Sequence, residues 1–408
     1  MQATAEPIQT ARGSAFEVLA VFLRLGLSSF GGPIAHLGYF RDEFVLRRRW
    51  MDERAYAELV GLCQFLPGPA SSQVGFSIGL ARAGWAGALA AWVGFTLPSA
   101  CLLTLFAFGA RVLTGSAGAG LVHGLKLVAV AIVAQAVWGM ARTLCPDRTR
   151  AGIALAAALI MLFSAITTTP AAAAQIAVIV LGAVAGALLC RAASEAPGAP
   201  LSVPVPRAVG LAALVLFLLL LFGLPLIARD NAGMAVFEAF YRAGALVFGG
   251  GHVVLPLLRE ALVPQGWVGE DAFLAGYGAA QAMPGPLFTF AAYLGALAQP
   301  GPQGVAGAAL GLVGIFLPGL LILVAALPFW QALRERPFAQ AMVRGVNAAV
   351  VGLLAAALYQ PVWTGAVGSS ADFAVALAGF MLLTVWRAPP LVVVIAGAVA
   401  GVVLAYIR

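Results

Sequence analysis

The sequence predicts an all-α polytopic membrane protein made of two homologous halves, and three observations support this prediction. Of the 408 residues, 62% are hydrophobic and only 10% are charged, against roughly 45–50% and about 25% in an ordinary soluble domain. The apolar residues gather in stretches near the 20 residues that cross roughly 30 Å of hydrocarbon as a helix. Motifs of the first half also return in the second half. Together these observations exclude a soluble enzyme.

The duplication is visible as motifs that recur about 218 residues apart. Phe30-Gly-Gly-Pro33 returns as Phe248-Gly-Gly-Gly251, and Pro67-Gly-Pro69 returns as Pro284-Gly-Pro286. Recurrence over most of the chain indicates a duplicated structural unit. We therefore predict an N-terminal tail over 1–14, a first repeat over 15–190, a linker with an extra apolar segment over 191–234, and a second repeat over 235–408.

Each half contains up to six apolar segments, and one more joins the halves. The segments of the first half are 15–35, 56–80, 84–109, 119–141, 151–168 and 171–190. Those of the second half are 236–256, 272–298, 304–330, 341–360, 372–386 and 388–407, and the joining run is 209–228. We expect about 10–13 transmembrane segments. Whether the second segment of each half crosses the membrane or re-enters is left open.

The excess of basic residues, 23 against 16 acidic, is a topology signal rather than a sign of a nucleic-acid partner. The loop after the first segment carries five arginines: Arg41, Arg47, Arg48, Arg49 and Arg54. Its counterpart in the second half keeps Arg259 but adds Glu260, Glu270 and Asp271. Since positively charged loops stay in the cytoplasm, equivalent loops are expected on opposite sides. This pattern predicts an inverted repeat whose first arginine-rich loop is cytoplasmic.

The two Pro-Gly-Pro runs predict broken helices in equivalent places. Proline lacks an amide donor and ends or kinks a helix, and the freed backbone groups must be satisfied inside the protein or in a water-filled cavity. A helix that starts after such a break presents amide groups and partial positive charge to an anion. A structural kink and close helix packing through small residues are the alternatives. The candidate substrate-binding residues at the breaks are Gly31, Gly32, Gly249, Gly250, Gln64, Gln281, Pro67, Gly68, Pro69, Ser71, Ser72, Pro284, Gly285, Pro286 and Thr289.

Charged side chains within apolar segments are further candidates, because such charges are costly and usually face a cavity or a partner. Arg24 and Arg242 occupy equivalent positions, and Lys126 has Asn347 as its counterpart. We count all three basic residues as substrate-binding candidates. Snorkelling to the membrane interface is the alternative. The candidates for proton coupling are Glu58, Glu17, Glu238, His36 and His252, for which local ion pairs are the competing interpretation.

The same residues indicate which chemistry to expect. Buried basic groups and helix N-termini favour an anionic substrate. The four scattered cysteines have no metal-ligand spacing, so neither a metal site nor another cofactor is expected. A nucleotide-binding loop is not found, which makes an ion or proton gradient the expected energy source.

Several segments together resemble the chromate ion transporter family, in its long two-domain form. They are FGGPIAHLGYFRDEFVLRRRW, FGGGHVVLPLLRE and QAMPGPLFTFAAYLG, and the resemblance extends over nearly the whole chain. It implies export of chromate from the cytoplasm driven by the proton motive force, chromate resistance, a place in the bacterial inner membrane, and no catalytic activity. Sulfate is a chemically similar dianion. The alternatives are a sulfate or other oxyanion transporter working as importer or exchanger, and a passive anion channel; a homodimer is left open.

Overall fold

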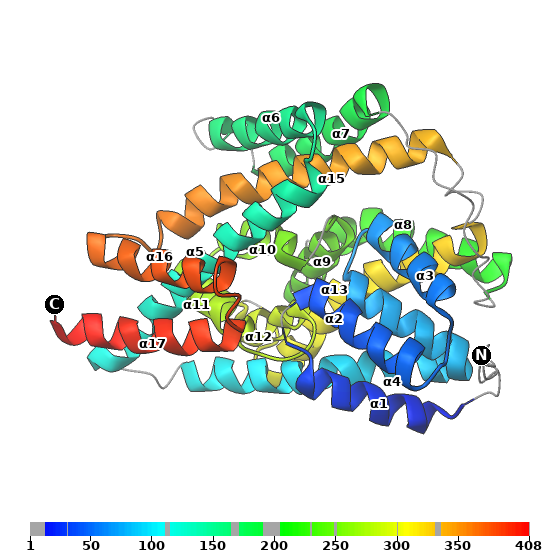
Figure 1. The fold of residues 1–408 in the computed structure, drawn as a ribbon, viewed down its shortest axis with the longest axis horizontal. Helices are drawn as coiled ribbons and strands as arrows, with labels where there is room; N and C mark the ends of the chain where they lie inside the picture. Colours follow the sequence, from blue (N-terminus) through cyan, green and yellow to red (C-terminus); the bar gives the residue numbers. More distant parts are fainter. Residues whose placement is uncertain are drawn as a thin grey trace, which may run out of the picture.

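The computed structural model describes residues 13–30, 32–110, 115–164, 171–190, 205–228, 231–248, 251–299, 301–330 and 336–407, and it is all-helical over these ranges. The first half contains α1 (Ala15–Ser28), α2 (Gly32–Arg41), η1 (Asp42–Arg47), α3 (Glu53–Phe65), α4 (Ala70–Ala110), α5 (Gly115–Leu144), α6 (Arg148–Ser164) and α7 (Ala171–Leu189). The joining segment forms α8 (Arg207–Ile227). Figure 1 shows their arrangement.

The second half repeats this order. It contains α9 (Ala232–Ala245), η3 (Gly251–Val253), α10 (Val254–Leu262), α11 (Glu270–Ala280), η4 (Leu287–Thr289), α12 (Phe290–Leu297), α13 (Gly304–Ala326), η5 (Leu327–Phe329), α15 (Pro337–Ala357), η6 (Leu358–Trp363), α16 (Ser370–Thr384) and α17 (Pro390–Ile407). Over the described ranges, both repeats therefore open with short helices and close with longer ones.

Long apolar helices make this a multi-pass membrane protein. Within the described ranges, the helices long and apolar enough to cross a membrane are Ala70–Gly109, Ser116–Leu144, Arg207–Ile227, Gly304–Phe329, Pro337–Trp363 and Pro390–Ile407. Their outer faces carry large apolar side chains, as Leu219 and Phe222 of α8 illustrate at 64% and 69% exposure. Such an apolar exterior suits contact with lipid tails.

The helix α4 is a hairpin of two helices. Ala83 and Gly84 have non-helical backbone angles, and Gly79, before the turn, lies directly against Gly87, after it. The first arm therefore runs from Ala70 to the turn and the second arm returns to Ala110. This division agrees with the separate apolar segments expected at 56–80 and 84–109.

The broken segments re-enter: the chain returns to the side from which it came. Trp50, just before α3, contacts the guanidinium of Arg82 at the end of the first arm of α4. In the second half, the Gln299 amide after α12 donates to the Trp267 carbonyl before α11 at 3.1 Å. Both Pro-Gly-Pro runs therefore lie at hairpin tips.

The first segment of each half is interrupted too, where single segments over 15–35 and 236–256 were predicted. α1 ends at Ser28, and α2 leads back to Arg41. Arg41 forms an ion pair with Glu53 at the start of α3. At the start of α2, Gly32 has a φ angle of +78°, a conformation that glycine adopts readily.

The two halves are inverted relative to each other. The Gly13 amide, just before α1, donates to the Arg82 carbonyl at 3.0 Å, so the hairpins of the first half open at this end. The second arm of α4 then runs about 35 Å, at 1.5 Å per residue, to Phe108. There it meets Gly304, at the open end of the α11–α12 hairpin. Hairpins of the second half thus open at the opposite end.

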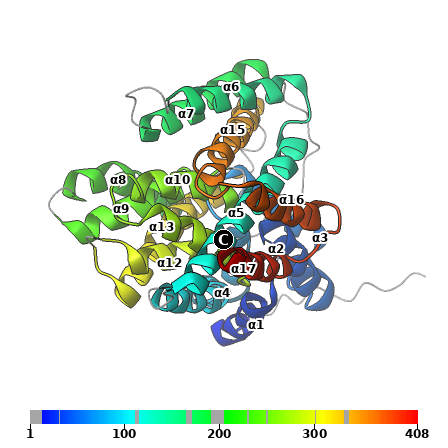
Figure 2. The same cartoon turned by 90° about the vertical axis from the view of Figure 1, so that its left-hand side faces the viewer.

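The last helices of each half pack on the other half, which interlocks the repeats. Gly120 and Gly124 of α5 lie against α17, and Gly345 of α15 lies against Gly182 and Gly186 of α7. Small residues allow this close approach of helix backbones in membranes. In both views α6 and α7 lie beside α15, while α17 lies beside α5 (Figures 1 and 2).

Candidate functional site

The hairpin tips of the two halves meet in the interior through a reciprocal pair of backbone hydrogen bonds. The Gly68 amide donates to the Val247 carbonyl at 2.7 Å, and the Gly285 amide donates to the Ser29 carbonyl at 2.8 Å. Gly68 and Gly285 are equivalent, as are Ser29 and Val247. Each Pro-Gly-Pro tip is therefore held by the end of the first helix of the opposite half. We call this pair of contacts, Gly68 with Val247 and Gly285 with Ser29, the crossing.

Glycine is required at both tips. Gly68 and Gly285 have φ angles of +116° and +96°, a region that side chains rarely adopt. A Cβ on Gly68 would lie 2.8 Å from the Gly319 Cα, and one on Gly285 would lie 2.9 Å from the Ser99 Oγ. Ser99 and Gly319 are themselves equivalent positions. Both tips therefore need glycine for the same two reasons: a positive φ angle and the absence of space for a Cβ.

A helix follows each break, as predicted. α4 begins at Ala70, and Ser71 and Ser72 in its first turn are buried. In the second half, η4 begins at Leu287 and leads into α12, and the Thr289 hydroxyl donates to the Pro286 carbonyl at 2.7 Å. Both helices start directly at the crossing.

Two buried polar residues, His36 and Gln73, have contacts next to the first break that the sequence did not reveal. The His36 Nδ1 lies 3.4 Å from the Ser71 Oγ. Gln73 donates from Nε2 to the Pro67 carbonyl at 2.9 Å and to the Gly319 carbonyl at 2.7 Å. Gln73 therefore connects the first tip to α13 of the second half.

Three further buried polar residues were missed: Ser29, Thr96 and Ser99. Each stands in an apolar segment and looks unremarkable by itself. A comparison of the halves position by position would have found them, because their counterparts are Val247, Phe316 and Gly319.

The two equivalent arginines lie on the first helices, outside the tips. Arg24 is exposed and lines a hollow of about 220 Å³ together with Asp42 and Arg47. Arg242 forms an ion pair with Glu238 on the same helix at 3.3 Å. Neither side chain has a recorded contact with the Pro-Gly-Pro runs in the described part of the chain.

Lys126 joins the two halves. Its Nζ lies 2.7 Å from the Asp271 Oδ1 at the start of α11. One turn earlier on α5, the His123 Nε2 lies 2.8 Å from the buried Asp372 Oδ1 on α16. Lys126 thus contacts the open end of the second-half hairpin rather than its tip.

The proton-coupling candidates are spread over the molecule. Glu17 pairs with Arg82 at 3.3 Å at the open end of the first hairpins, and the His252 Nδ1 lies 2.8 Å from the Tyr277 hydroxyl. Glu58 lines a hollow of about 310 Å³ that Gln64 and Arg344 also line. Of this group, His36 has recorded contacts at the crossing.

Gln281 and the prolines of the two Pro-Gly-Pro runs lie at or next to the breaks. Gln281 directly follows α11, and its buried Nε2 has no hydrogen-bond partner among the described residues. Pro69, Pro284 and Pro286 are buried and Pro67 is half-buried. Gly32 begins α2 with a φ of +78°. Gly31, Gly249 and Gly250 lie outside the described residues.

Ion pairs hold the arginine-rich loop in place. The equivalent pairs Arg41–Glu53 and Arg259–Glu270 have N–O distances of 2.7 Å and 2.9 Å. Burial alone would raise the pKa of Glu43, but hydrogen bonds from Arg48 and Arg47 hold this pKa below its ordinary value.

In the described ranges, groups of three or more His, Cys, Asp or Glu side chains able to hold a metal ion are not found.

Taken together, the fold and the crossing define a class: a polytopic membrane protein of two inverted, interlocked repeats whose broken helices meet in the interior. Transporters of this class bind their substrates where such broken helices meet. The family model described as "Chromate transporter" matches residues 16–188 and again 234–402. The chain belongs to the chromate transporter family.

Individual relatives agree with this assignment. The chain is 28% identical to the "Chromate transport protein" of Pseudomonas aeruginosa over 94% of this chain and 91% of that protein. It is 26% identical to the "Chromate transport protein" of Cupriavidus metallidurans over 84% of this chain and 81% of that protein. A match of 27% identity covers 97% of the "Uncharacterized transporter YwrA" of Bacillus subtilis but 42% of this chain. Solved structures with a significant match were not found.

Proposed function

We propose that the protein is a secondary active transporter that exports chromate from the cytoplasm, is driven by the proton motive force and confers chromate resistance. We place it in the bacterial inner membrane with no catalytic role, and we take sulfate to be a competing dianion. The observation that supports this proposal most strongly is the reciprocal crossing of the tips, Gly68 with Val247 and Gly285 with Ser29. The names of the relatives support the choice of substrate.

The crossing suits alternating access. Its two hairpins open toward opposite ends of the molecule, so each tip separates the centre from one side. A rocking movement of one repeat against the other would expose the centre to the two sides in turn. The two backbone hydrogen bonds and the bond from Gln73 to the Gly319 carbonyl are few enough to break and re-form in each cycle.

The dianion binds between the Pro-Gly-Pro tips in this proposal. The N-terminus of α4, at Ala70, offers partial positive charge there. Arg24 lies five residues before Ser29, about 7 Å along the helix, and Arg242 holds the equivalent position. The two arginines draw the dianion to the tips. A carboxylate or Lys126 couples the proton; the ion pair of Lys126 with Asp271, which spans the halves, is a contact that movement between repeats would change.

The test is uptake of radiolabelled chromate into inside-out membrane vesicles that contain the protein. With an imposed proton gradient we expect accumulation against the chromate gradient, and excess sulfate should inhibit it. Vesicles with a collapsed gradient, and vesicles without the protein, are the controls. Flux that only equilibrates chromate would replace the proposal by a passive channel. Accumulation only in right-side-out vesicles would replace it by an importer.

A further inference from the structure

We infer that the oxyanion site is one-sided: a cluster of uncharged polar side chains from the first half supplies most of the groups that bind the tetrahedral dianion, and the second half contributes mainly apolar side chains. The cluster consists of Ser29, His36, Ser71, Ser72, Thr96 and Ser99, and is called the hydroxyl cluster below. This inference rests on the proposed function for the identity of the substrate.

Contacts connect the hydroxyl cluster to the crossing. His36 contacts Ser71 through Nδ1, and its ring lies edge-on to Phe95 with centroids 5.2 Å apart. The Phe95 carbonyl and the Ser99 hydroxyl both face Gly285. Gly285 in turn donates to the Ser29 carbonyl.

Two further members complete the cluster. The Ser99 hydroxyl donates to the Thr96 carbonyl at 3.1 Å, and Ser72 follows Ser71 in the first turn of α4. The cluster therefore comes from the segment after α1, from α2 and from both arms of α4, of which Ser29 and Ser99 contact the Gly285 tip directly.

The cluster is buried and incompletely hydrogen-bonded. Ser29, His36, Ser72 and Thr96 are at most 3% exposed. The Ser29 Oγ, Ser72 Oγ and Thr96 Oγ1 atoms have no hydrogen-bond partner among the described residues. Most buried polar atoms in proteins have a partner, and each exception calls for an explanation. Several exceptions beside one tip indicate a place where a ligand supplies the missing partners.

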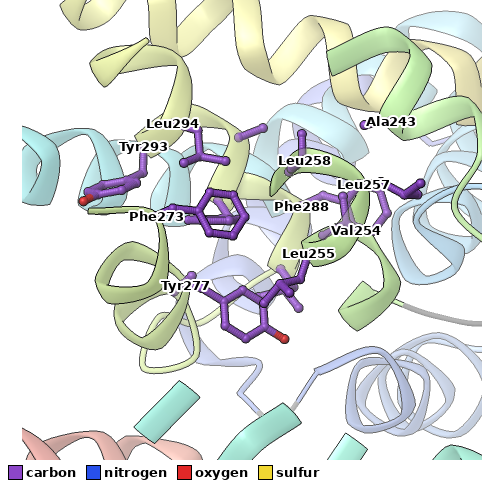
Figure 3. Close-up of a cluster of buried hydrophobic side chains, with 14 of the residues drawn as sticks. Ala243, Val254, Leu255, Leu257, Leu258, Phe273, Tyr277, Phe288, Tyr293 and Leu294 are labelled. Atoms are coloured by element: carbon purple, nitrogen blue, oxygen red, sulfur yellow. The ribbon is translucent and has the colours of Figure 1, made fainter. Parts of the chain in front are cut away.

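At most equivalent positions, the second half shows that the fold does not require these polar groups. The exception is Ser72, whose counterpart Thr289 is buried with its hydroxyl bonded to the Pro286 carbonyl. The positions equivalent to Ser29, His36 and Thr96 are Val247, Val254 and Phe316, all fully buried in one hydrophobic cluster. The position equivalent to Ser71 is Phe288, which lies beside Val254 among apolar side chains (Figure 3). The same backbone therefore closes well around an apolar interior, so packing does not explain the polar residues of the first half.

The chemistry of the cluster favours a tetrahedral oxyanion. The Ser29, Ser72 and Thr96 hydroxyls can each donate one hydrogen bond to a ligand. The Ser71 hydroxyl already contacts His36, and the Ser99 hydroxyl already donates to the Thr96 carbonyl. Within the described part of the chain, the hydrogen bonds of the cluster involve no carboxylate, lysine or arginine side chain. Donors from several directions suit the four oxygens of chromate or sulfate, and the α4 N-terminus adds partial positive charge.

Equilibrium binding to the purified full-length protein in detergent tests this inference. Radiolabelled chromate and radiolabelled sulfate are the probes, and Ser29→Ala, His36→Gln and Thr96→Val are the variants. Each variant should weaken binding of both anions by about 10-fold or more, because a hydrogen bond to a charged group is lost. Thr96→Val keeps the shape of the side chain and so keeps the fold.

Two matched controls change nearby hydroxyls that bond within their own helices. Ser28 donates to the Arg24 carbonyl and Thr104 to the Ala100 carbonyl, so Ser28→Ala and Thr104→Val should bind both anions within about two-fold of the unchanged protein. Cluster variants that bind as tightly as the controls would overturn the inference, as would an unchanged protein that binds neither anion. Because no gradient is used, this result is separate from the vesicle test: failed proton coupling with intact binding would remove the proposed function and leave the one-sided site.

Discussion

The two halves of the chain cross at equivalent glycines but line the crossing differently. On the backbone they match: Gly68 reaches Val247, and Gly285 reaches Ser29. In side chains they diverge, since the first half buries hydroxyls and an imidazole where the second buries valine and phenylalanine. The contrast separates two demands. The contact between two inverted halves requires the same backbone conformation in each half. Recognition of one substrate requires hydrogen-bond donors from one half only.

The largest effect is expected where the halves are alike. Gly68→Ala and Gly285→Ala each force a Cβ into positive φ and into the opposite half. We expect each variant to lose about 2–5 kcal/mol of stability and nearly all chromate transport. Thermal unfolding in detergent and vesicle uptake measure the two effects. Gly38→Ala is the control, because a Cβ there meets nothing within 4 Å; one tip tolerating alanine would show that the crossing is not symmetric in function.

The next effect concerns the equivalent arginines. Arg24→Ala and Arg242→Ala should each reduce chromate uptake by about 10-fold or more, because a positive charge that draws the dianion toward the tips is lost. Membrane insertion, measured as protein yield in the membrane fraction, should stay unchanged for Arg24→Ala. Arg242→Ala should also lower stability, since it leaves the half-buried Glu238 without its recorded ion-pair partner.

Exposed Arg207 at the start of α8 supplies the control for both arginine variants, and Arg207→Ala should leave uptake unchanged. Uptake kinetics of Arg24→Ala or Arg242→Ala equal to those of this control would exclude that arginine from the transport path.

Stability should respond with opposite sign in the two halves when a threonine near the crossing becomes valine. Thr96 carries a buried hydroxyl with no partner among the described residues, so Thr96→Val should stabilise the anion-free protein by about 1 kcal/mol. The Thr289 hydroxyl is bonded to the Pro286 carbonyl, so Thr289→Val should destabilise it by about 1 kcal/mol. Unfolding midpoints measured without oxyanion compare the two, and equal shifts would contradict the asymmetry.

The smallest effect is expected at the duplicated ion pair on the outer loops. Arg41–Glu53 has side chains about half exposed, while Arg259–Glu270 is less exposed and makes two parallel hydrogen bonds. Arg41→Ala should have almost no effect on stability, and Arg259→Ala should cost about 1 kcal/mol. The difference should shrink at high salt, and the salt dependence of the unfolding midpoint checks it. A larger loss at Arg41 would reverse the ranking.

Local sequence rules were enough to predict the duplication, the broken helices and the inverted arrangement. Proline cannot donate an amide hydrogen bond wherever it lies, so a Pro-Gly-Pro run interrupts a helix in any context. The opposite charges of equivalent loop positions, such as Arg54 and Asp271, can likewise be seen in the sequence, and they predicted the inversion. The path of the chain after the break was not predictable, because a crossing segment and a re-entrant one have the same hydrophobicity.

The sequence by itself determined the class of the protein and the places where its helices are interrupted. Composition and repeats are properties of the sequence, and proline interrupts a helix through its own backbone. What only the tertiary structure decided is which carbonyl accepts each tip amide and which residues gather around it. Ser29 and Gly285 are 256 positions apart in the chain, and nothing local links them. Their hydrogen bond exists because two inverted repeats bring opposite hairpin tips together, and the same packing turns scattered hydroxyls into one buried cluster.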